Sequence, residues 1–317
     1  MKLRIGFLAL AFSLLCLTPG ALAAERLSLA TGGTAGTYFP IGGAIANAVS
    51  KGGVVQATAE TSNASVANIN LVGKGEIETA IVQNDVTFWA YNGQNMFENA
   101  PVKNLRAVLA LYPEHVHLVV SKASNITKLA DLRGKRVSVG APGSGVEANV
   151  RGVLQAAGMT YKDLGDAQRM DFASTANRFK DNQIDAAFLT TGYPSPAIMD
   201  IATTKDITLV SMDSAFLDNL HKIYPYFVPD KIPAGTYRGV DKDAATPAVM
   251  AIIVAHDKVS EKVVYEFLKG IFDNLSDVQA SHAKAKEISL DKALSGLTVP
   301  LHPGAVKFYK EKGIKLP

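Results

Sequence analysis

The stretch that decides the fold reads LSLATGGTAGTY and covers residues 27–38. Its first four residues, 27–30, are mainly apolar and predict a short strand. The next eight are small, flexible or hydroxylated, and an apolar helix is predicted to begin near Phe39 and Pro40. A strand, a polar loop and a helix in this order form the repeating unit of an α/β protein, in which ligands bind beside the loops that follow the strands.

The alternation of strand and helix continues to about Leu220. Helices are predicted at 146–157, which Gly158 ends, and at 260–272, where five apolar residues share one face. This alternation predicts parallel sheets with helices on both sides. The predicted strands are 27–30, 54–59, 79–83, 105–111, 116–121, 137–140, 186–190 and 207–211.

Polar loops also follow four other predicted strands, at residues 61–65, 83–85, 141–145 and 190–194. Their glycines let the backbone approach a ligand closely, and their hydroxyl and amide groups can form hydrogen bonds. The helices that start there offer free N–H groups and a partial positive charge, which suit a carboxylate or a phosphate. Each loop alone could be an ordinary helix cap or turn. Together the loops predict a ligand site.

An approximate internal repeat indicates two lobes. Residues 77–82 (IETAIV) resemble 184–189 (IDAAFL), and residues 28–34 resemble 138–144, at offsets of 107 and 110. Buried strands of any α/β protein can also look alike, and the repeat alone leaves that reading open. Two lobes of about 100 to 130 residues agree with the usual size of a domain.

The composition excludes several classes of protein. Hydrophobic residues make up 48% of the 317 residues and charged residues 19%, which is enough apolar material for a large core and too little charge for a disordered chain. The net charge of +3 is far below the basic field that nucleic-acid binding needs, so we expect no nucleic-acid partner. The single Cys excludes a disulfide framework and argues against a thiolate zinc site.

The N-terminus has the features of a secretory signal peptide. Lys2 and Arg4 precede the apolar stretch 5–17, and small residues at its end place the cleavage after Ala23. Without this segment the chain has 30 basic and 29 acidic residues and no Cys, which suits an oxidising compartment. A lipid anchor on Cys16 is the alternative, but the residue directly before it is not small. No later apolar stretch is long enough to span a bilayer.

Motifs of exported enzymes are present only in part. Residues 33–36 lack the full dinucleotide-binding spacing, and no Walker lysine follows a glycine loop. Residues 143–145 resemble part of a nucleophile elbow, but Pro142 occupies the position of its first glycine. We therefore expect no enzymatic activity and no cofactor, with a hydrolase that uses Ser144 as the competing interpretation.

A histidine pair offers a second competing interpretation. His115 and His117 are two residues apart on a predicted strand, beside Glu114, so both rings could face one side and bind a metal ion. Such a pair is more often half buried and structural, and we predict no metal site.

Longer motifs resemble the TAXI family, the solute-binding subunits of tripartite ATP-independent periplasmic (TRAP) transporters. The match runs in order over nearly all of the mature chain, and its motifs are far longer than a generic glycine loop. The matching segments are TGGTAGTYFPIGG at 31–43, TSNASVANI at 61–69, QNDV at 83–86 with WAY at 89–91, and LHPGA at 301–305.

The resemblance implies an α/β fold of the two-lobed periplasmic binding protein type (type II), in which each lobe is a mixed sheet flanked by helices and the ligand lies in a cleft between the lobes. It implies capture of a small anionic solute, either a glutamate-like amino acid or a dicarboxylate. The protein would deliver this solute to a TRAP membrane permease that uses a sodium gradient. We expect the protein to be a monomer in the periplasm. The resemblance implies that thirteen residues bind the ligand: Thr34, Ala35, Tyr38, Ser62, Asn63, Ser65, Gln83, Asn84, Ser144, Gly145, Thr190, Thr191 and Tyr193.

Two apolar segments, near 116–120 and 248–255, are predicted to cross between the lobes. We place lobe I at residues 24–118 plus 246–317 and lobe II at residues 119–245. The other large TRAP subfamily clamps the ligand carboxylate with an arginine, for which Arg106, Arg136 and Arg151 are the candidates here. A subunit that reports a bound solute to a membrane receptor is a third function compatible with the sequence.

Overall fold

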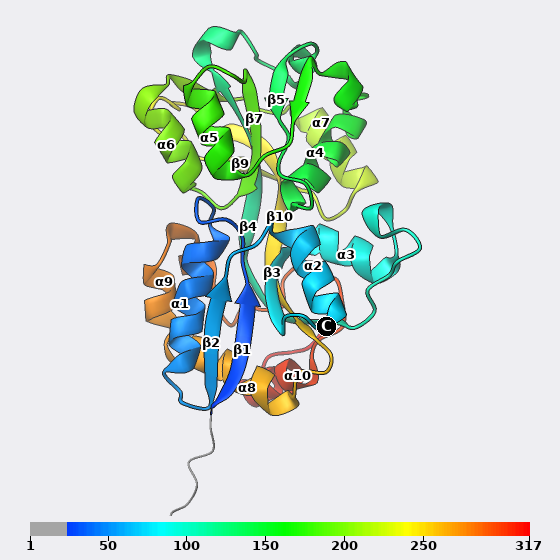
Figure 1. Cartoon of the computed structure of the whole chain (residues 1–317), viewed down its shortest axis with the longest axis vertical. Helices are drawn as coiled ribbons and strands as arrows, with labels where there is room; N and C mark the ends of the chain where they lie inside the picture. The colour runs from blue at the N-terminus through cyan, green and yellow to red at the C-terminus, as the bar shows by residue number, and fades with distance from the viewer. Residues whose placement is uncertain (1–23) are drawn as a thin grey trace, which may run out of the picture.

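A computed structural model describes residues 24–317, so the predicted signal peptide, with Cys16, lies outside the described residues. The molecule has two halves, which Figure 1 draws one above the other. Two long strands, β4 (Leu105–Ser121) and β10 (Ala244–His256), run through both. Among the helices of residues 24–317, none is both long and apolar enough to span a membrane.

The remaining elements divide between the halves as follows. The lower half of Figure 1 contains β1 (Glu25–Ala30), α1 (Tyr38–Ser50), β2 (Val55–Glu60), α2 (Ser65–Lys74), β3 (Thr79–Gln83), α3 (Asn84–Asn92), α8 (Glu261–Asp273), α9 (Leu275–Ala280) and α10 (Pro303–Glu311). The upper half contains β5 (Arg136–Ser138), α4 (Gly145–Ala156), β6 (Asp166–Gln168), α5 (Phe172–Lys180), β7 (Ala186–Thr191), α6 (Pro196–Thr204), β8 (Ile207–Leu209), α7 (Ser214–Ile223) and β9 (Val228–Ile232).

The strands form one mixed sheet in the order β2-β1-β3-β10-β4-β7-β5-β6, with β8 beside β4 and β9 beside β10. The prediction of parallel pairing is correct for β1, β2 and β3 and for β5, β6 and β7. It is wrong for the centre of the sheet, because β10 is antiparallel to β3 and β4, and β4 is antiparallel to β7.

The predicted strands 105–111 and 116–121 are a single strand of 17 residues, β4. The residues between them continue the pairing, since Tyr112 lies opposite Ala251 and His115 lies opposite Ala248 of β10. From His115 onward β4 pairs instead with β7. The strand therefore changes partner where it passes from the lower half to the upper half.

The internal repeat corresponds to equivalent parts of the two halves. The repeated segments lie on β1 and β3 in the lower half and on β5 and β7 in the upper half. β1 is parallel to β3, and β5 is parallel to β7. The acidic residue before the second strand also has one role in both halves: Glu78 accepts a hydrogen bond from the Ser28 N–H (2.8 Å), and Asp185 accepts one from the Arg136 N–H (2.9 Å).

Helices cover both faces of the sheet in each half. Successive side chains of a strand point to opposite faces, so Ile252 packs with α2 and α3 while Ile253 packs with α1, α8 and α10. The upper half shows the same division. Phe188 packs with α4 and α7, whereas Leu189 packs with α5 and α6. The five apolar residues predicted on one face of 260–272 are all buried on α8. The fold is thus a mixed sheet flanked by helices, which agrees with the fold that the family resemblance implies.

Candidate functional site

A cavity of about 200 Å³ lies between the two halves. Its lower wall is made by the loops after β1 and β2, by the end of β3 and by Glu114 of β4. Its upper wall is made by the loop before α4, the start of α5 and the end of β7. The carboxyl ends of parallel strands from both halves therefore meet at one site, where open α/β sheets bind their ligands.

The structure brings most of the predicted ligand residues together. Eleven of the thirteen line the cavity: Thr34, Ala35, Tyr38, Ser62, Asn63, Ser65, Gln83, Ser144, Gly145, Thr190 and Thr191. The other two, Asn84 and Tyr193, are not among its lining residues.

Asn84 is a correction to the prediction, because its side chain is used inside the lower half. The amide donates to the Gly296 carbonyl (3.1 Å) and accepts from the Met250 N–H (3.0 Å). The backbone carbonyl of Asn84 accepts a third hydrogen bond, from the Thr298 hydroxyl (2.9 Å). Asn84 thus joins the start of α3 to β10 and to the segment near residue 297.

Tyr193 is the second correction. Its ring packs edge-on against His115, with 4.8 Å between ring centroids, and the Lys284 Nζ lies 3.8 Å from its centroid. Lys284 is buried and also pairs with Glu287 (2.7 Å). Tyr193 therefore packs against a buried cation and is not among the residues that line the cavity.

Several hydroxyl groups in the lining hold the loops in shape. Ser62 Oγ donates to the Thr31 carbonyl (2.9 Å) and accepts from the Ala64 N–H (2.9 Å). Ser65 Oγ accepts from the Gln83 N–H (3.1 Å), and Ser144 Oγ caps α4 by accepting from the Glu147 N–H (3.1 Å). These side chains position the cavity walls, which agrees with the reading of such loops as caps.

Two helices begin at the cavity without a side-chain cap. Neither Thr37 before α1 nor Ala64 before α2 accepts a capping hydrogen bond with its side chain. Ala64 has φ 65° and ψ −149°, a conformation that is costly for any residue except glycine and that is concentrated at ligand sites. The start of a helix carries a partial positive charge, so these two helix starts would favour an anionic group of a ligand.

Glu114 also lines the cavity, although the sequence analysis did not assign it to this site. It is 2% exposed, and its Oε2 accepts a hydrogen bond from the Tyr38 hydroxyl (2.6 Å). Burial raises the pKa of Glu114 to about 8, with a smaller contribution from the Asp85 carboxylate, while hydrogen bonds from Tyr38 and Gln83 act in the opposite direction. Burial also raises the pKa of Tyr38.

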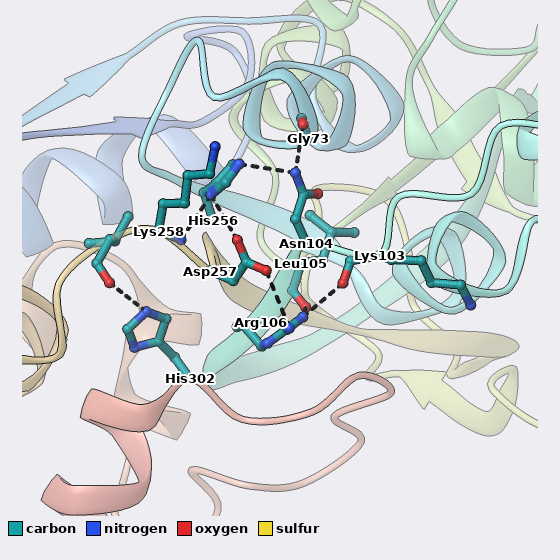
Figure 2. Close-up of polar contacts among 10 residues, drawn as sticks. Gly73, Lys103, Asn104, Leu105, Arg106, His256, Asp257, Lys258 and His302 are labelled. Carbon is teal, nitrogen blue, oxygen red and sulfur yellow. Dashed lines mark hydrogen bonds and ion pairs between the residues drawn. The ribbon is translucent and has the colours of Figure 1, made fainter.

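The three candidate arginines all lie outside this cavity. Arg106 lies near the far end of β4, where Figure 2 shows it directed to the carbonyls of Lys103 and Leu105 (both 2.8 Å) and to Asp257 (3.3 Å). Arg136 pairs with Asp185 (2.7 Å). Arg151 pairs with Glu147 (2.8 Å) and lines a second hollow of about 830 Å³. No Lys, Arg or His is among the described residues that line the smaller cavity.

The histidine pair is held in a structural network. His117 Nδ1 donates to the carbonyl oxygens of His115 (2.9 Å) and Leu189 (3.1 Å). Because Nδ1 carries the proton, Nε2 of the neutral ring is an acceptor, and the Tyr237 hydroxyl donates to it (2.9 Å). His115 Nε2 donates to Asp230 (2.9 Å). Burial lowers the pKa of His117 to about 3. Within residues 24–317 no cluster of three or more His, Cys, Asp or Glu residues could hold a metal ion.

The Ser144 hydroxyl likewise has a structural partner, as the cap of α4. A serine nucleophile needs a general base within hydrogen-bond reach. No histidine is among the described residues of the cavity lining, and Glu114 is already paired with Tyr38. The geometry therefore does not favour a hydrolase at Ser144.

Hydrogen bonds join the two halves around the cavity. Asn149 of α4 donates to Asp85 of α3 (2.6 Å), and the hydroxyls of Thr37 and Thr191 are bonded to each other. The Ala67 N–H donates to the Gly143 carbonyl (3.1 Å). These contacts join the two halves directly.

One solved structure with a similar fold is a protein from Bordetella bronchiseptica RB50. The two sequences are 15% identical, the match covers 92% of this chain and 99% of that chain, and the TM-score is 0.56. A binding protein component of an ABC phosphonate transporter from Pseudomonas aeruginosa has 12% identity, covers 82% and 79% of the two chains, and gives a TM-score of 0.50. At these identities the likeness shows the fold, that of periplasmic binding proteins. A sequence model of the NMT1-like family matches residues 29–313, and the chain therefore belongs to the NMT1-like family.

Proposed function

We propose that this protein is a periplasmic solute-binding protein that captures a small carboxylate between its two halves and carries out no chemical reaction on it. The observation that supports this most strongly is the cavity, which both halves line and on which the uncapped starts of α1 and α2 converge. A carboxylate there would receive backbone N–H groups and the favourable ends of two helix dipoles without any formal cation.

The movement that we propose is rotation of lobe I, residues 24–118 plus 246–317, against lobe II, residues 119–245. Only β4 and β10 would bend, because they are the two long strands that run through both halves. An open form would admit the solute, and closure would exclude water and strengthen each hydrogen bond to it.

The finer assignment, also a proposal, is to the TAXI subunits of TRAP transporters. It is supported by the four long sequence motifs, three of which contribute residues to the cavity. On this assignment the protein is a monomer that docks transiently on a membrane permease. The relative from Pseudomonas aeruginosa belongs to an ABC transporter, so reconstitution with each type of permease would test the transporter class.

Solute binding is expected to change the fluorescence of Trp89, the one tryptophan of the chain. Its indole N–H donates to the Tyr226 hydroxyl across the halves (2.5 Å), and the two rings pack edge-on at 5.3 Å. A screen of amino acids and dicarboxylates should yield a ligand that raises the melting temperature, because ligand that binds only the folded state stabilises it. The same ligand should shift the Trp89 emission.

Trp89→Phe serves as the control, since it must lose the emission signal and keep the thermal shift. A folded protein whose melting temperature rises with no compound of the screen would contradict the proposed function. A thermal shift without any change at Trp89 would contradict the proposed closure.

Tyr38→Ala is expected to weaken solute binding at least tenfold, which corresponds to about 1.4 kcal/mol. The substitution removes an aromatic wall of the cavity and the hydroxyl that donates to Glu114. Titration calorimetry with the ligand from the screen would measure the change. Tyr91→Ala, on α3 and outside the cavity lining, is the matched control. An affinity of Tyr38→Ala within about twofold of the parent protein would show that the tyrosine does not contact the solute.

A further inference from the structure

The cavity lining contains a buried carboxyl group and two buried polar atoms that lack hydrogen-bond partners. Glu114 lines the cavity, and its Oε2 accepts a hydrogen bond from the Tyr38 hydroxyl. The two atoms with no hydrogen-bond partner among the described residues are Gln83 Oε1, an acceptor, and Thr190 Oγ1, a hydroxyl that can donate or accept. Buried polar atoms of this kind are costly unless they form hydrogen bonds. A ligand that supplies donors would remove this cost.

The charges in the lining have one sign. Glu114 and Asp171 are its ionisable acids, and none of the described lining residues is a lysine, an arginine or a histidine. The start of α1 and the start of α2 can hold one carboxylate. A second carboxylate on the solute would find no further cation and would be repelled by Glu114 when Glu114 is ionised.

We propose that Glu114 is the specificity-determining residue of the cavity and that it pairs with a protonated amine of the solute. Solutes that carry one carboxylate and one ammonium group in proximity, as amino acids do, are then selected over dicarboxylates without an amine. This inference rests on the proposed solute-binding function and decides between the two solute classes that the sequence left open.

The pairing also links binding to a proton. The groups that face Glu114 are Tyr38 of α1, Tyr112 of the same strand, Asp85 of α3 and the neutral Gln83, and none of these groups is a cation. With a pKa of about 8, Glu114 is mostly protonated at pH 7. An ammonium group that binds beside it favours the carboxylate, so a proton is released. Affinity should therefore rise as the pH increases from 6 towards 8.

The test compares the L-amino acids with their matched acids that lack the amine, for example L-glutamate with glutarate and L-aspartate with succinate. Titration calorimetry at pH 7.5 should find at least one amino acid that binds at least tenfold more tightly than its matched acid. Glu114→Gln should lose at least tenfold in affinity for that amino acid and most of the discrimination. Two buffers of different ionisation enthalpy should reveal proton release by the parent protein and none by Glu114→Gln.

The exposed Glu98→Gln, outside the cavity lining, is the matched control and should bind like the parent protein. The preference of the parent protein needs no variant, so a folding defect in Glu114→Gln would leave the test intact. A dicarboxylate bound as tightly as the best amino acid, or a folded Glu114→Gln with unchanged affinity, would overturn the role of Glu114 and leave the solute-binding function standing. Binding of neither set would overturn that function and this inference with it.

Discussion

Gly145→Ala is expected to weaken solute binding ten- to hundredfold while both halves stay folded. Gly145 is the first residue of α4 and lies against the lower half across the cavity. A Cβ atom there would lie 2.8 Å from Ser65 Oγ and closer still to Gln83 Oε1. Overpacking of this kind costs about 1–3 kcal/mol, and each 1.4 kcal/mol is a factor of ten in affinity.

The effect should be confined to the closed form, because both obstructing residues belong to the opposite half. Alanine also suits the first turn of a helix better than glycine does. Gly43→Ala on α1 is the matched control, since its added Cβ would meet nothing within 4 Å. Calorimetry would measure affinity, and small-angle scattering with excess ligand should show a more open Gly145→Ala. A compact Gly145→Ala with parental affinity would contradict the closure that we propose.

The ligand-free protein is expected to lose stability as the pH rises towards 8, and Glu114→Gln is expected to remove much of that loss. In the folded state the pKa of Glu114 is raised to about 8, from 4.5 when exposed. Its contribution to the free energy of unfolding is therefore fully present below pH 4.5 and is lost as the pH rises through 8. This difference in pKa corresponds to a change on the order of 5 kcal/mol in the free energy of unfolding.

Two other buried groups, Asp85 and His117, also make the free energy of unfolding depend on pH, so the comparison with Glu114→Gln is necessary. Burial raises the pKa of Asp85 to about 7, so its effect has the same sign as that of Glu114. The lowered pKa of His117 acts oppositely, since its contribution is complete above pH 6.5 and is lost as the pH falls towards 3. Urea unfolding of refolded, ligand-free protein at pH 5 and pH 8 would give the four free energies. An equal dependence on pH in parent and variant would contradict a buried, protonated Glu114.

The loops of the cavity could be predicted because each follows a strand and precedes a helix, an order that the residues 27–38 already display. Position along the chain did not determine which way a side chain points. Asn84 is next to Gln83, yet its amide bonds Met250 and Gly296 while Gln83 lines the cavity. The direction is set by β10, which arrives from more than 160 residues later in the chain.

Glu114 was missed for a related reason. It lies between two runs that the sequence analysis treated as separate strands, and its neighbours His115 and His117 suggested a metal site. On one continuous strand successive side chains face opposite sides, so Glu114 reaches the cavity while His115 packs against Tyr193 and His117 packs against Tyr237. The one carboxyl group on this mostly apolar strand was the available signal. The short edge strand β6 was missed because its three residues, Asp166–Gln168, are polar or small and carry no alternating pattern.

The change of partner along β4 has a consequence for the order of events in binding. Glu114 precedes His115, the residue at which β4 leaves β10 for β7. A group at a pivot moves little when the two sides rotate about it. The carboxylate would therefore be available to the solute before closure, whereas Gly145 reaches its neighbours only afterwards. Capture and retention are then separate kinetic steps, in which Glu114 governs the association rate and the contact at Gly145 governs the dissociation rate.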